Sequence, residues 1–314
     1  MTRRLAVLDA PRHLATEPRT GAPSREREVA YAMRQRALVA RLGARDAGVV
    51  DTPCCPDAEP PPELRGPRPG RGGFQTFTEA LARRTSEIVG AREFPVVLGG
   101  DCSILLGNML ALRRLGRYGL VFVDGHDEFT YAPDRHRPCG YFASAGLDLA
   151  LATGNGPDAL SNLYGLKPYV DERNVVLFGM QRDEEDEPCG PATDVPCIQQ
   201  LRLERIRQVG ARAAASEALS YLEAQSLDGF WIHVDADVLD REPVDCFAED
   251  DMADETGAGG LAFDEIGEAL EVFLSSERAA GLEMTIYDPE LDPDGDCGDR
   301  LVNSVVRAFT PATA

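Results

Sequence analysis

The sequence contains short apolar runs that do not alternate with polar residues, and segments with a helical spacing of apolar residues separate them. Clear runs are FPVVLGG (94–100), GLVFVDGH (119–126) and NVVLFGM (174–180). A strand that is apolar on both faces is buried on both faces, which is typical of parallel sheets covered by helices. We therefore expect an α/β fold, a three-layer α-β-α sandwich with a mainly parallel sheet, formed by one domain over residues 1–314.

The rest of the chain continues this alternation. We expect further strands at residues 4–9, 47–53, 197–203, 229–237 and 281–289. We expect helices at residues 25–43, 76–91, 103–116, 204–225, 267–276 and 299–310. Segments 53–73 and 248–260 are rich in Gly, Pro or acidic residues and should be loops, either simply solvated or bordering a site.

Charge and composition exclude several classes of partner. The net charge is −21, with 53 acidic against 32 basic residues, which argues against nucleic acid or an anionic membrane surface. No apolar run reaches the roughly 18 residues of a membrane span, and the first residues resemble a strand more than a signal peptide. The eight cysteines form no Cys-x-x-Cys pair. We therefore expect a cytoplasmic protein with free thiols and a small-molecule substrate.

Residues of metal-binding type follow three of the expected strands. The three groups are Asp101 with Cys102, Asp124 with His126, Asp127 and Glu128, and Asp235 with Asp237. Residues two apart in a strand share a face, so Asp124, His126 and Glu128 can converge, and so can Asp235 and Asp237. Several carboxylates gathered without cations would repel one another and lose hydration, so the pattern predicts bound divalent metal.

With these motifs the sequence resembles the ureohydrolase family, which includes arginase and agmatinase. The family reads G-G-D-H-S, D-A-H-x-D, D-x-D-x-x-D-P and E-V-N-P in this order. This chain reads GGDCS (99–103), DGHDE (124–128), DADVLD (235–240) and IYDP (286–289), with GAGGL (257–261) similar to the family's Gly-rich loop. The resemblance covers nearly the whole chain and implies the arginase/deacetylase-like version of the expected sandwich.

The resemblance also implies a pair of divalent ions, with manganese as the expected metal. Asp124 and Asp235 would bridge both ions. His126 and Asp237 would complete one of them, which we call the intact metal.

The second ion, which we call the altered metal, would be held by Cys102 and Glu128 where the family has His and Asp. Asp127 is an alternative for the carboxylate ligand. A thiolate shifts metal preference from manganese toward softer ions, so zinc, cobalt or iron are alternatives. A centre in which only the intact metal is filled is a further alternative.

The residues that would contact substrate also depart from the family pattern. Ile286 stands where the family has the Glu that holds a guanidinium, which argues against arginine itself as substrate. Cys139 aligns with the family's loop His, and His136 lies nearby, so both are candidates for moving protons. Asp183 and Glu185 are candidates for binding the polar end of the substrate. His233 we interpret as a buried core histidine.

These features together predict a hydrolase of linear C–N bonds in an amidine, guanidino or amide substrate. A metal-bound hydroxide would attack the sp² carbon, with Glu128 orienting it. One alternative is an amide hydrolase with a single metal, similar to histone deacetylases. Another is a pseudoenzyme that acts as a binding or regulatory protein. The resemblance also implies a possible trimer or hexamer of identical chains.

Overall fold

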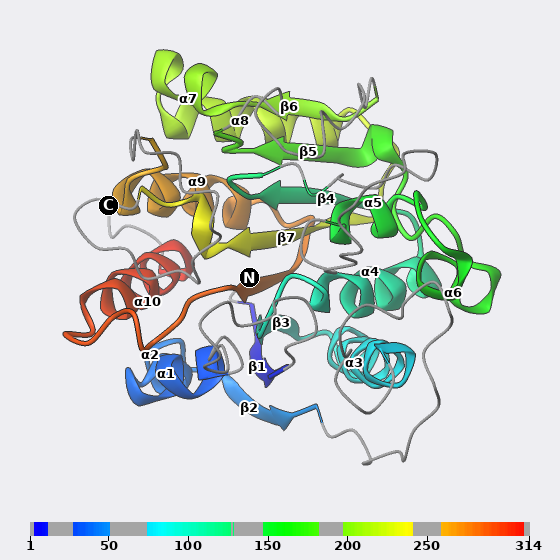
Figure 1. The fold of residues 1–314 in the computed structure, drawn as a ribbon, viewed down its shortest axis with the longest axis horizontal. Coiled ribbons are helices and arrows are strands. Elements are labelled where there is room, and N and C mark those ends of the chain that lie inside the picture. Colours follow the sequence, from blue (N-terminus) through cyan, green and yellow to red (C-terminus); the bar gives the residue numbers. More distant parts are fainter. Residues whose placement is uncertain are drawn as a thin grey trace, which may run out of the picture.

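The computed structural model describes residues 3–11, 28–50, 74–126, 128, 147–181, 197–240 and 259–310. Within these residues eight strands form one sheet in which every neighbouring pair is parallel, in the order β2-β1-β3-β8-β7-β4-β5-β6 (Figure 1). The strands are β1 (Leu5–Asp9), β2 (Arg45–Val49), β3 (Phe94–Leu98), β4 (Tyr118–Val123), β5 (Val175–Phe178), β6 (Gln199–Leu201), β7 (Gly229–Asp235) and β8 (Ala279–Thr285).

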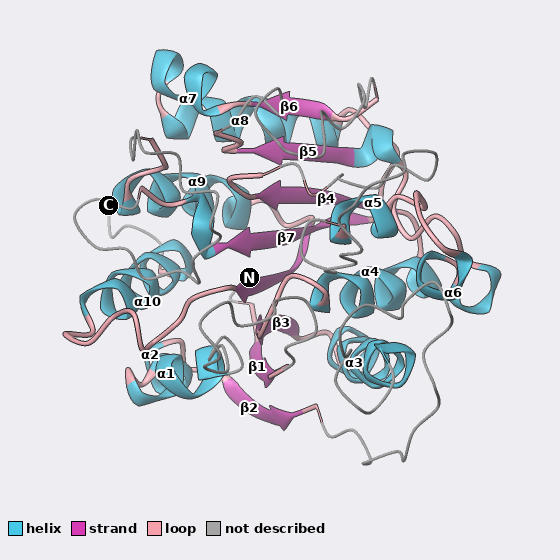
Figure 2. Ribbon diagram, in the orientation of Figure 1, coloured by secondary structure: helices cyan, strands magenta, loops and turns pink. Residues whose placement is uncertain are grey.

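Helices cover both faces of this sheet (Figure 2). One face is covered by α3 (Phe74–Gly90), α4 (Ile104–Leu115), α5 (Asp148–Ala152) and α6 (Asp158–Ser161). The other is covered by α1 (Val29–Gln35), α2 (Leu38–Arg41), α7 (Leu203–Val209), α8 (Ala211–Glu223), α9 (Phe263–Ser275) and α10 (Asp296–Phe309). In β4, Leu120 and Phe122 pack toward α3 and α4, whereas Val121 and Val123 pack toward the other layer. The expected three-layer α/β sandwich is thereby confirmed.

Two of the expected helices are each divided into two. The helix expected at 25–43 breaks between α1 and α2, where Ala37 has a left-handed φ of 56°. The helix expected at 204–225 breaks between α7 and α8 at Gly210, whose φ of 85° is accessible because glycine has no Cβ. The short helices α5 and α6 were not expected.

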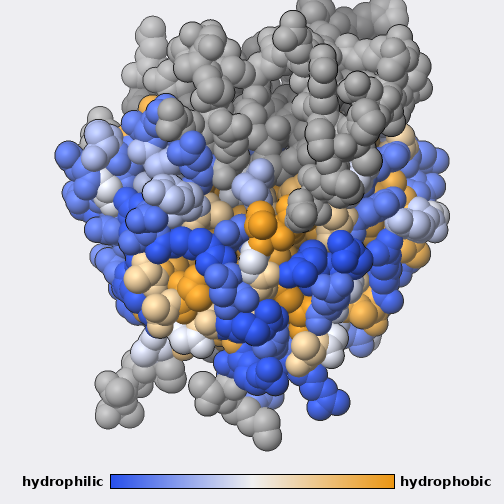
Figure 3. All heavy atoms as spheres, turned by 90° about the horizontal axis from the view of Figure 1, so that it is seen from below, coloured by the Kyte–Doolittle hydropathy of each residue, from blue (hydrophilic) through white to orange (hydrophobic). Residues whose placement is uncertain are grey.

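The strand expected at 47–53 is β2, which spans Arg45–Val49 instead. It lies at the edge of the sheet, and only its central residue, Ala47, is buried, so it lacks the apolar pattern of the inner strands. Figure 3 shows the molecule from below, where β2 lies in Figure 1, and hydrophilic residues predominate among the coloured atoms. Charged residues on a short edge strand disfavour pairing with another chain.

No helix within the described ranges is both long and apolar enough to cross a membrane. Of the cysteines in those ranges, Cys102 and Cys197 are free thiols. Cys297, in the first turn of α10, is disulfide-bonded. The expectation of free thiols throughout is therefore wrong at Cys297.

Candidate metal centre

The C-terminal ends of β3, β8, β7 and β4 lie side by side at one end of the sheet, because these four strands are neighbours and run in the same direction. Cys102 follows β3, Ile286 follows β8, Asp235 ends β7 and Asp124 follows β4. Ligands of open α/β sheets bind at this end. The strand order thus brings together side chains as distant in the sequence as Cys102 and Asp235, which are 133 residues apart.

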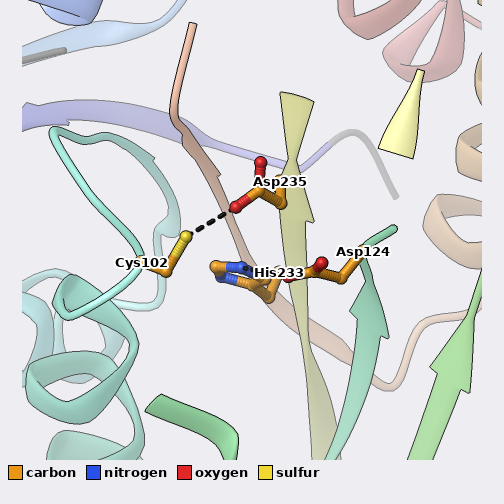
Figure 4. Close-up of side chains that lie close together, drawn as sticks. All are labelled: Cys102, Asp124, His233 and Asp235. Carbon is orange, nitrogen blue, oxygen red and sulfur yellow. Dashed lines mark hydrogen bonds and ion pairs between the residues drawn. The ribbon is translucent and has the colours of Figure 1, made fainter. Parts of the chain in front are cut away.

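Two aspartates each use one oxygen to shape the backbone that follows them. Oδ1 of Asp124 accepts a hydrogen bond from the backbone N–H of His126 at 2.7 Å. Oδ1 of Asp235 accepts one from the backbone N–H of Asp237 at 2.8 Å. Each bond spans two residues, as in an Asx turn, and holds the carboxylate at the end of its strand. The second oxygen of each carboxylate points toward the other side chains labelled in Figure 4.

Cys102, Asp124, His233 and Asp235 form what we call the Cys102 cluster, shown in Figure 4. All four side chains are buried, and one ligand-type atom of each lies within 4.8 Å of those of the others. The thiol of Cys102 donates a hydrogen bond to Oδ2 of Asp235, with sulfur and oxygen 2.6 Å apart. The hydroxyl oxygen of Thr285 lies 3.5 Å from the same sulfur.

His233 is buried as expected, but it is also a member of this cluster. Its ring stacks on Phe122, with centroids 4.5 Å apart and planes 8° apart. Its Nδ1 lies 2.6 Å from Oε1 of Glu283, and its Nε2 lies 4.0 Å from Oδ2 of Asp124. Sequence reasoning overlooked its place here, although His233 precedes Asp235 by two residues and therefore shares its face of the strand.

A second group, the His126 cluster, consists of Asp124, His126 and Glu128. Nδ1 of His126 lies 3.7 Å from Oδ1 of Asp124 and 3.9 Å from Oε1 of Glu128. The same nitrogen lies 3.1 Å from Oδ2 of Asp237. Glu128, expected beside Cys102, lies within ion-pair distance of His126, and its charge also acts on Cys102. Its φ of 51° is uncommon for a residue with a side chain. Asp124 belongs to both clusters.

Burial and crowding shift the acid–base properties of these groups. Burial, followed by the charge of Asp237, raises the pKa of the Asp124 and Asp235 carboxyls well above the ordinary value. Burial by itself would lower the pKa of His126, but the charge and hydrogen bond of Asp237 raise it to about 10. Burial and the charge of Asp235 raise the pKa of the Cys102 thiol. All of these shifts favour bound protons, which cations of higher charge can replace.

The residues of both clusters fit divalent metal. Thiolate, imidazole and carboxylate are the donors that zinc and related ions take in proteins. Oδ2 of Asp124 and Nε2 of His233 are buried and have no hydrogen-bond partner within the described residues. Buried polar atoms without partners are rare, and an ion is one of the few groups that accounts for them.

A model of the arginase family matches residues 3–310. The chain belongs to the arginase family. Its relatives include the arginase of Bacillus subtilis (strain 168), 27% identical over 228 residues that cover 72% of each chain. The arginase of Staphylococcus aureus (strain MRSA252) is 26% identical over 235 residues, 74% of this chain and 72% of the relative.

Solved structures of the family share the fold over almost the whole chain. The Bacillus subtilis arginase structure superimposes with a TM-score of 0.80 at 22% identity, covering 99% of this chain and 100% of that one. The formimidoylglutamase of Bacillus subtilis subsp. subtilis str. 168 gives a TM-score of 0.70 at 17% identity, covering 98% of this chain and 86% of that one. At these identities the likeness shows the arginase fold alone.

Ile286 lies beside the Cys102 cluster of this arginase-family chain, directly after Thr285. It is buried, and its backbone N–H donates a hydrogen bond to the carbonyl of Gly100 at 3.0 Å. Its φ of 72° is an outlier for a β-branched residue, a kind of strain that costs about 1–3 kcal/mol and concentrates at functional sites. An apolar side chain is therefore held at the position where the family resemblance places a carboxylate.

Asp148 is a buried acid that sequence reasoning missed. It begins α5, and burial followed by the charge of Glu128 raises the pKa of its carboxyl well above the ordinary value. The charge of Asp148 in turn acts on Cys102 and Asp124. The available signal was an aspartate within the otherwise apolar run LDLALA (147–152).

Several expected site residues of this arginase-family chain lie outside the described residues. They are Asp127, His136, Cys139, Asp183 and Glu185. The segments 53–73 and 248–258 also lie outside them. The described part of the centre therefore consists of the Cys102 and His126 clusters and the residues packed around them.

Proposed function

We propose that the protein is a metal-dependent hydrolase of a linear C–N bond, acting on an amidine, guanidino or amide group of a small molecule other than arginine. The observation that carries this proposal is that the Cys102 and His126 clusters share Asp124 at the C-terminal ends of the strands. Two adjoining groups of ligands with a common carboxylate suit two ions close together, an arrangement used for hydrolysis. Membership of the arginase family supports the same class of reaction.

In this proposal Asp124, His126, Asp235 and Asp237 would hold the intact metal. Asp124, Asp235, Cys102 and Glu128 would hold the altered metal. The ions, manganese by family resemblance or zinc, cobalt or iron because of the sulfur, supply an activated water and offset negative charge when they are bound.

The chain's own residues then position the reactants. Glu128, adjacent to His126, is proposed to accept a hydrogen bond from the attacking water and orient it. Ile286 presents no charge to a cationic substrate, which favours a neutral or differently anchored group. Asp127, His136 and Cys139 remain proposed participants in proton transfer, and Asp183 and Glu185 remain proposed contacts to substrate.

The proposal is tested by metal analysis of protein purified without chelators, followed by a screen for released ammonia, urea or amine. Amidines, guanidino compounds and amides are offered in parallel with L-arginine. We expect bound divalent metal in the wild type, and loss of metal and turnover in Asp235→Asn. His126→Ala should lose the intact metal and turnover. Asp158→Asn is the matched control, because Asp158 is an exposed carboxylate paired with Lys167.

Wild-type protein that holds no metal and takes up no added manganese, zinc or cobalt would overturn the proposal. So would metal-loaded protein that turns over none of the three substrate classes.

A further inference from the structure

We propose that His233 is a ligand of the altered metal and supplies, from β7, the imidazole that the chain lacks at Cys102. The inference deepens the proposed function, because it names a ligand of the same metal centre. It assigns a new role to a residue outside the sequence motifs. It also makes Glu283 a positioning residue for that ligand.

The sheet itself places His233 at the centre. In the parallel register His233 lies opposite Glu283 of β8 and Phe122 of β4. Cross-strand neighbours and residues two apart in a strand share one face, so all of these project with Asp235 toward the layer of α3 and α4. Figure 4 shows the imidazole between Cys102 and Asp124, with Asp235 beside them.

A buried chain of hydrogen bonds fixes which nitrogen of His233 carries the proton. Thr85 donates its hydroxyl proton to Oδ1 of Asn108 at 2.6 Å, and Nδ2 of Asn108 donates to Oε2 of Glu283. Oε1 of Glu283 is then left to accept a hydrogen bond from the N–H at Nδ1 of His233, 2.6 Å away. All four residues are fully buried.

This arrangement leaves Nε2 of His233 with a lone pair. A histidine whose other nitrogen is held by a carboxylate is the usual form of a metal-binding histidine, since the carboxylate fixes both the tautomer and the ring orientation. The same chain orients Nε2 toward the Cys102 cluster. Glu283, through Asn108, thus ties the ligand to α4, which begins just after Cys102.

Nε2 of His233 and Oδ2 of Asp124 face each other as two acceptors. They are 4.0 Å apart, and neither has a hydrogen-bond partner within the described residues. This separation is too wide for a hydrogen bond. Tetrahedral zinc with bonds of about 2.0–2.2 Å holds its ligand atoms roughly 3.3–3.6 Å apart, so the two atoms lie a few tenths of an ångström farther apart than two ligands of one ion. A cation satisfies both atoms, whereas a core histidine without a ligand leaves them unpaired.

The donors of the Cys102 cluster are one sulfur, one imidazole nitrogen and two carboxylates. This set combines borderline and soft donors and matches zinc better than manganese, which prefers oxygen. With His233 included, the cluster has four protein ligands without Glu128. Glu128 is then available to the His126 side, where the structure places it.

The test uses the full-length His126→Ala variant, which removes the only other histidine of the described centre. It is loaded with one equivalent of zinc and studied by X-ray absorption spectroscopy. We expect sulfur scattering from Cys102 together with the multiple scattering of a coordinated imidazole. Sulfur scattering without an imidazole signal would overturn the inference.

Zinc affinity provides a second readout, from competition with a chromophoric chelator. His233→Gln should lower zinc affinity more than Glu283→Gln does, and Glu283→Gln should lower it by about 10–100-fold, as is typical when a metal-binding histidine loses its supporting carboxylate. Trp231→Phe is the matched control, because Trp231 is buried two residues earlier on the same strand face but offers no metal ligand. Equal zinc affinity of His233→Gln and Trp231→Phe would contradict the inference.

These readouts separate the inference from the proposed function. Imidazole coordination in a protein that turns over no substrate supports the ligand role of His233 while the proposed function fails. Turnover by a metal-loaded protein without imidazole coordination supports the function and overturns the role of His233.

Discussion

The sulfur of Cys102 lies 2.6 Å from Oδ2 of Asp235, so the thiol donates a hydrogen bond to the carboxylate. At these two positions the family resemblance implies a histidine and an aspartate that bind one metal ion together. Both side chains are buried; Cys102 lies in the loop after β3, and Asp235 is the last residue of β7. A divalent ion between them would displace the thiol proton and be neutralised by the same two groups.

Cobalt should therefore give a sulfur-to-metal charge-transfer band in the near ultraviolet, since Cys102 binds as a thiolate. Cys102→Ser should abolish the band and shift metal preference toward manganese. Cys197→Ser is the matched control, because Cys197 is the other free thiol of the described residues. The measurement is absorption spectroscopy during cobalt titration, and a band that survives in Cys102→Ser would remove the cysteine from the centre.

The metal-free protein should lose stability as the pH rises. Burial raises the pKa of Asp124 and Asp235 above their unfolded values, so the native state binds more protons than the unfolded state from about pH 4 upward. The raised pKa of His126, about 10, acts in the same direction, because its contribution is present below pH 6.5 and is lost as the pH rises through 10.

Metal binding should reverse this trend, because the ligands must lose their protons to bind an ion. We expect zinc to raise the Tm more at pH 8 than at pH 6, and zinc uptake at pH 7 to release protons. Thermal unfolding with and without chelator, and calorimetry in buffers of different ionisation enthalpy, measure the two effects. A Tm increase that shrinks between pH 6 and pH 8 would contradict the prediction.

L-Arginine and agmatine should be poor substrates. Ile286 leaves a guanidinium without the carboxylate partner that the family resemblance places there, and an unpaired buried charge costs several kcal/mol. Ile286→Glu should lower the KM for these two compounds, whereas Ile286→Leu should not. Steady-state assays of urea release test this, and wild-type turnover of arginine at roughly 1–1000 per second would refute it.

Asp148→Asn should stabilise the metal-free protein at pH 8. The pKa of Asp148 is raised by burial and by Glu128, and each unit of such a shift corresponds to about 1.4 kcal/mol. An amide resembles the neutral acid and removes the cost of ionising it. Chemical denaturation of both chelated proteins measures the change, with exposed Asp158→Asn expected to stay within about 0.5 kcal/mol of wild type. A loss of stability in Asp148→Asn would show that the charge of Asp148 is needed.

The sequence alone was sufficient for the fold class, because the signals are local. Apolar runs such as 94–98 are buried on both faces only in a covered parallel sheet, and the helical spacing between them supplies the covering layers. It was also sufficient to place Cys102, Asp124 and Asp235 near strand ends, since each lies within a few residues of the end of its own apolar run. Local signals were weakest at the exposed edge strand β2 and at Gly210, where one expected helix becomes two.

Which of these strand ends meet was decided only by the tertiary structure. The sheet order places β8 between β3 and β7, so Glu283 lies opposite His233 and turns an apparent core histidine toward Asp124 and Cys102. Glu128, whose backbone is left-handed, likewise lies within ion-pair distance of His126. Such contacts depend on pairing between residues that are distant in the chain. A sequence pattern predicts on which face of a strand a residue lies, but not which other strand lies beside it.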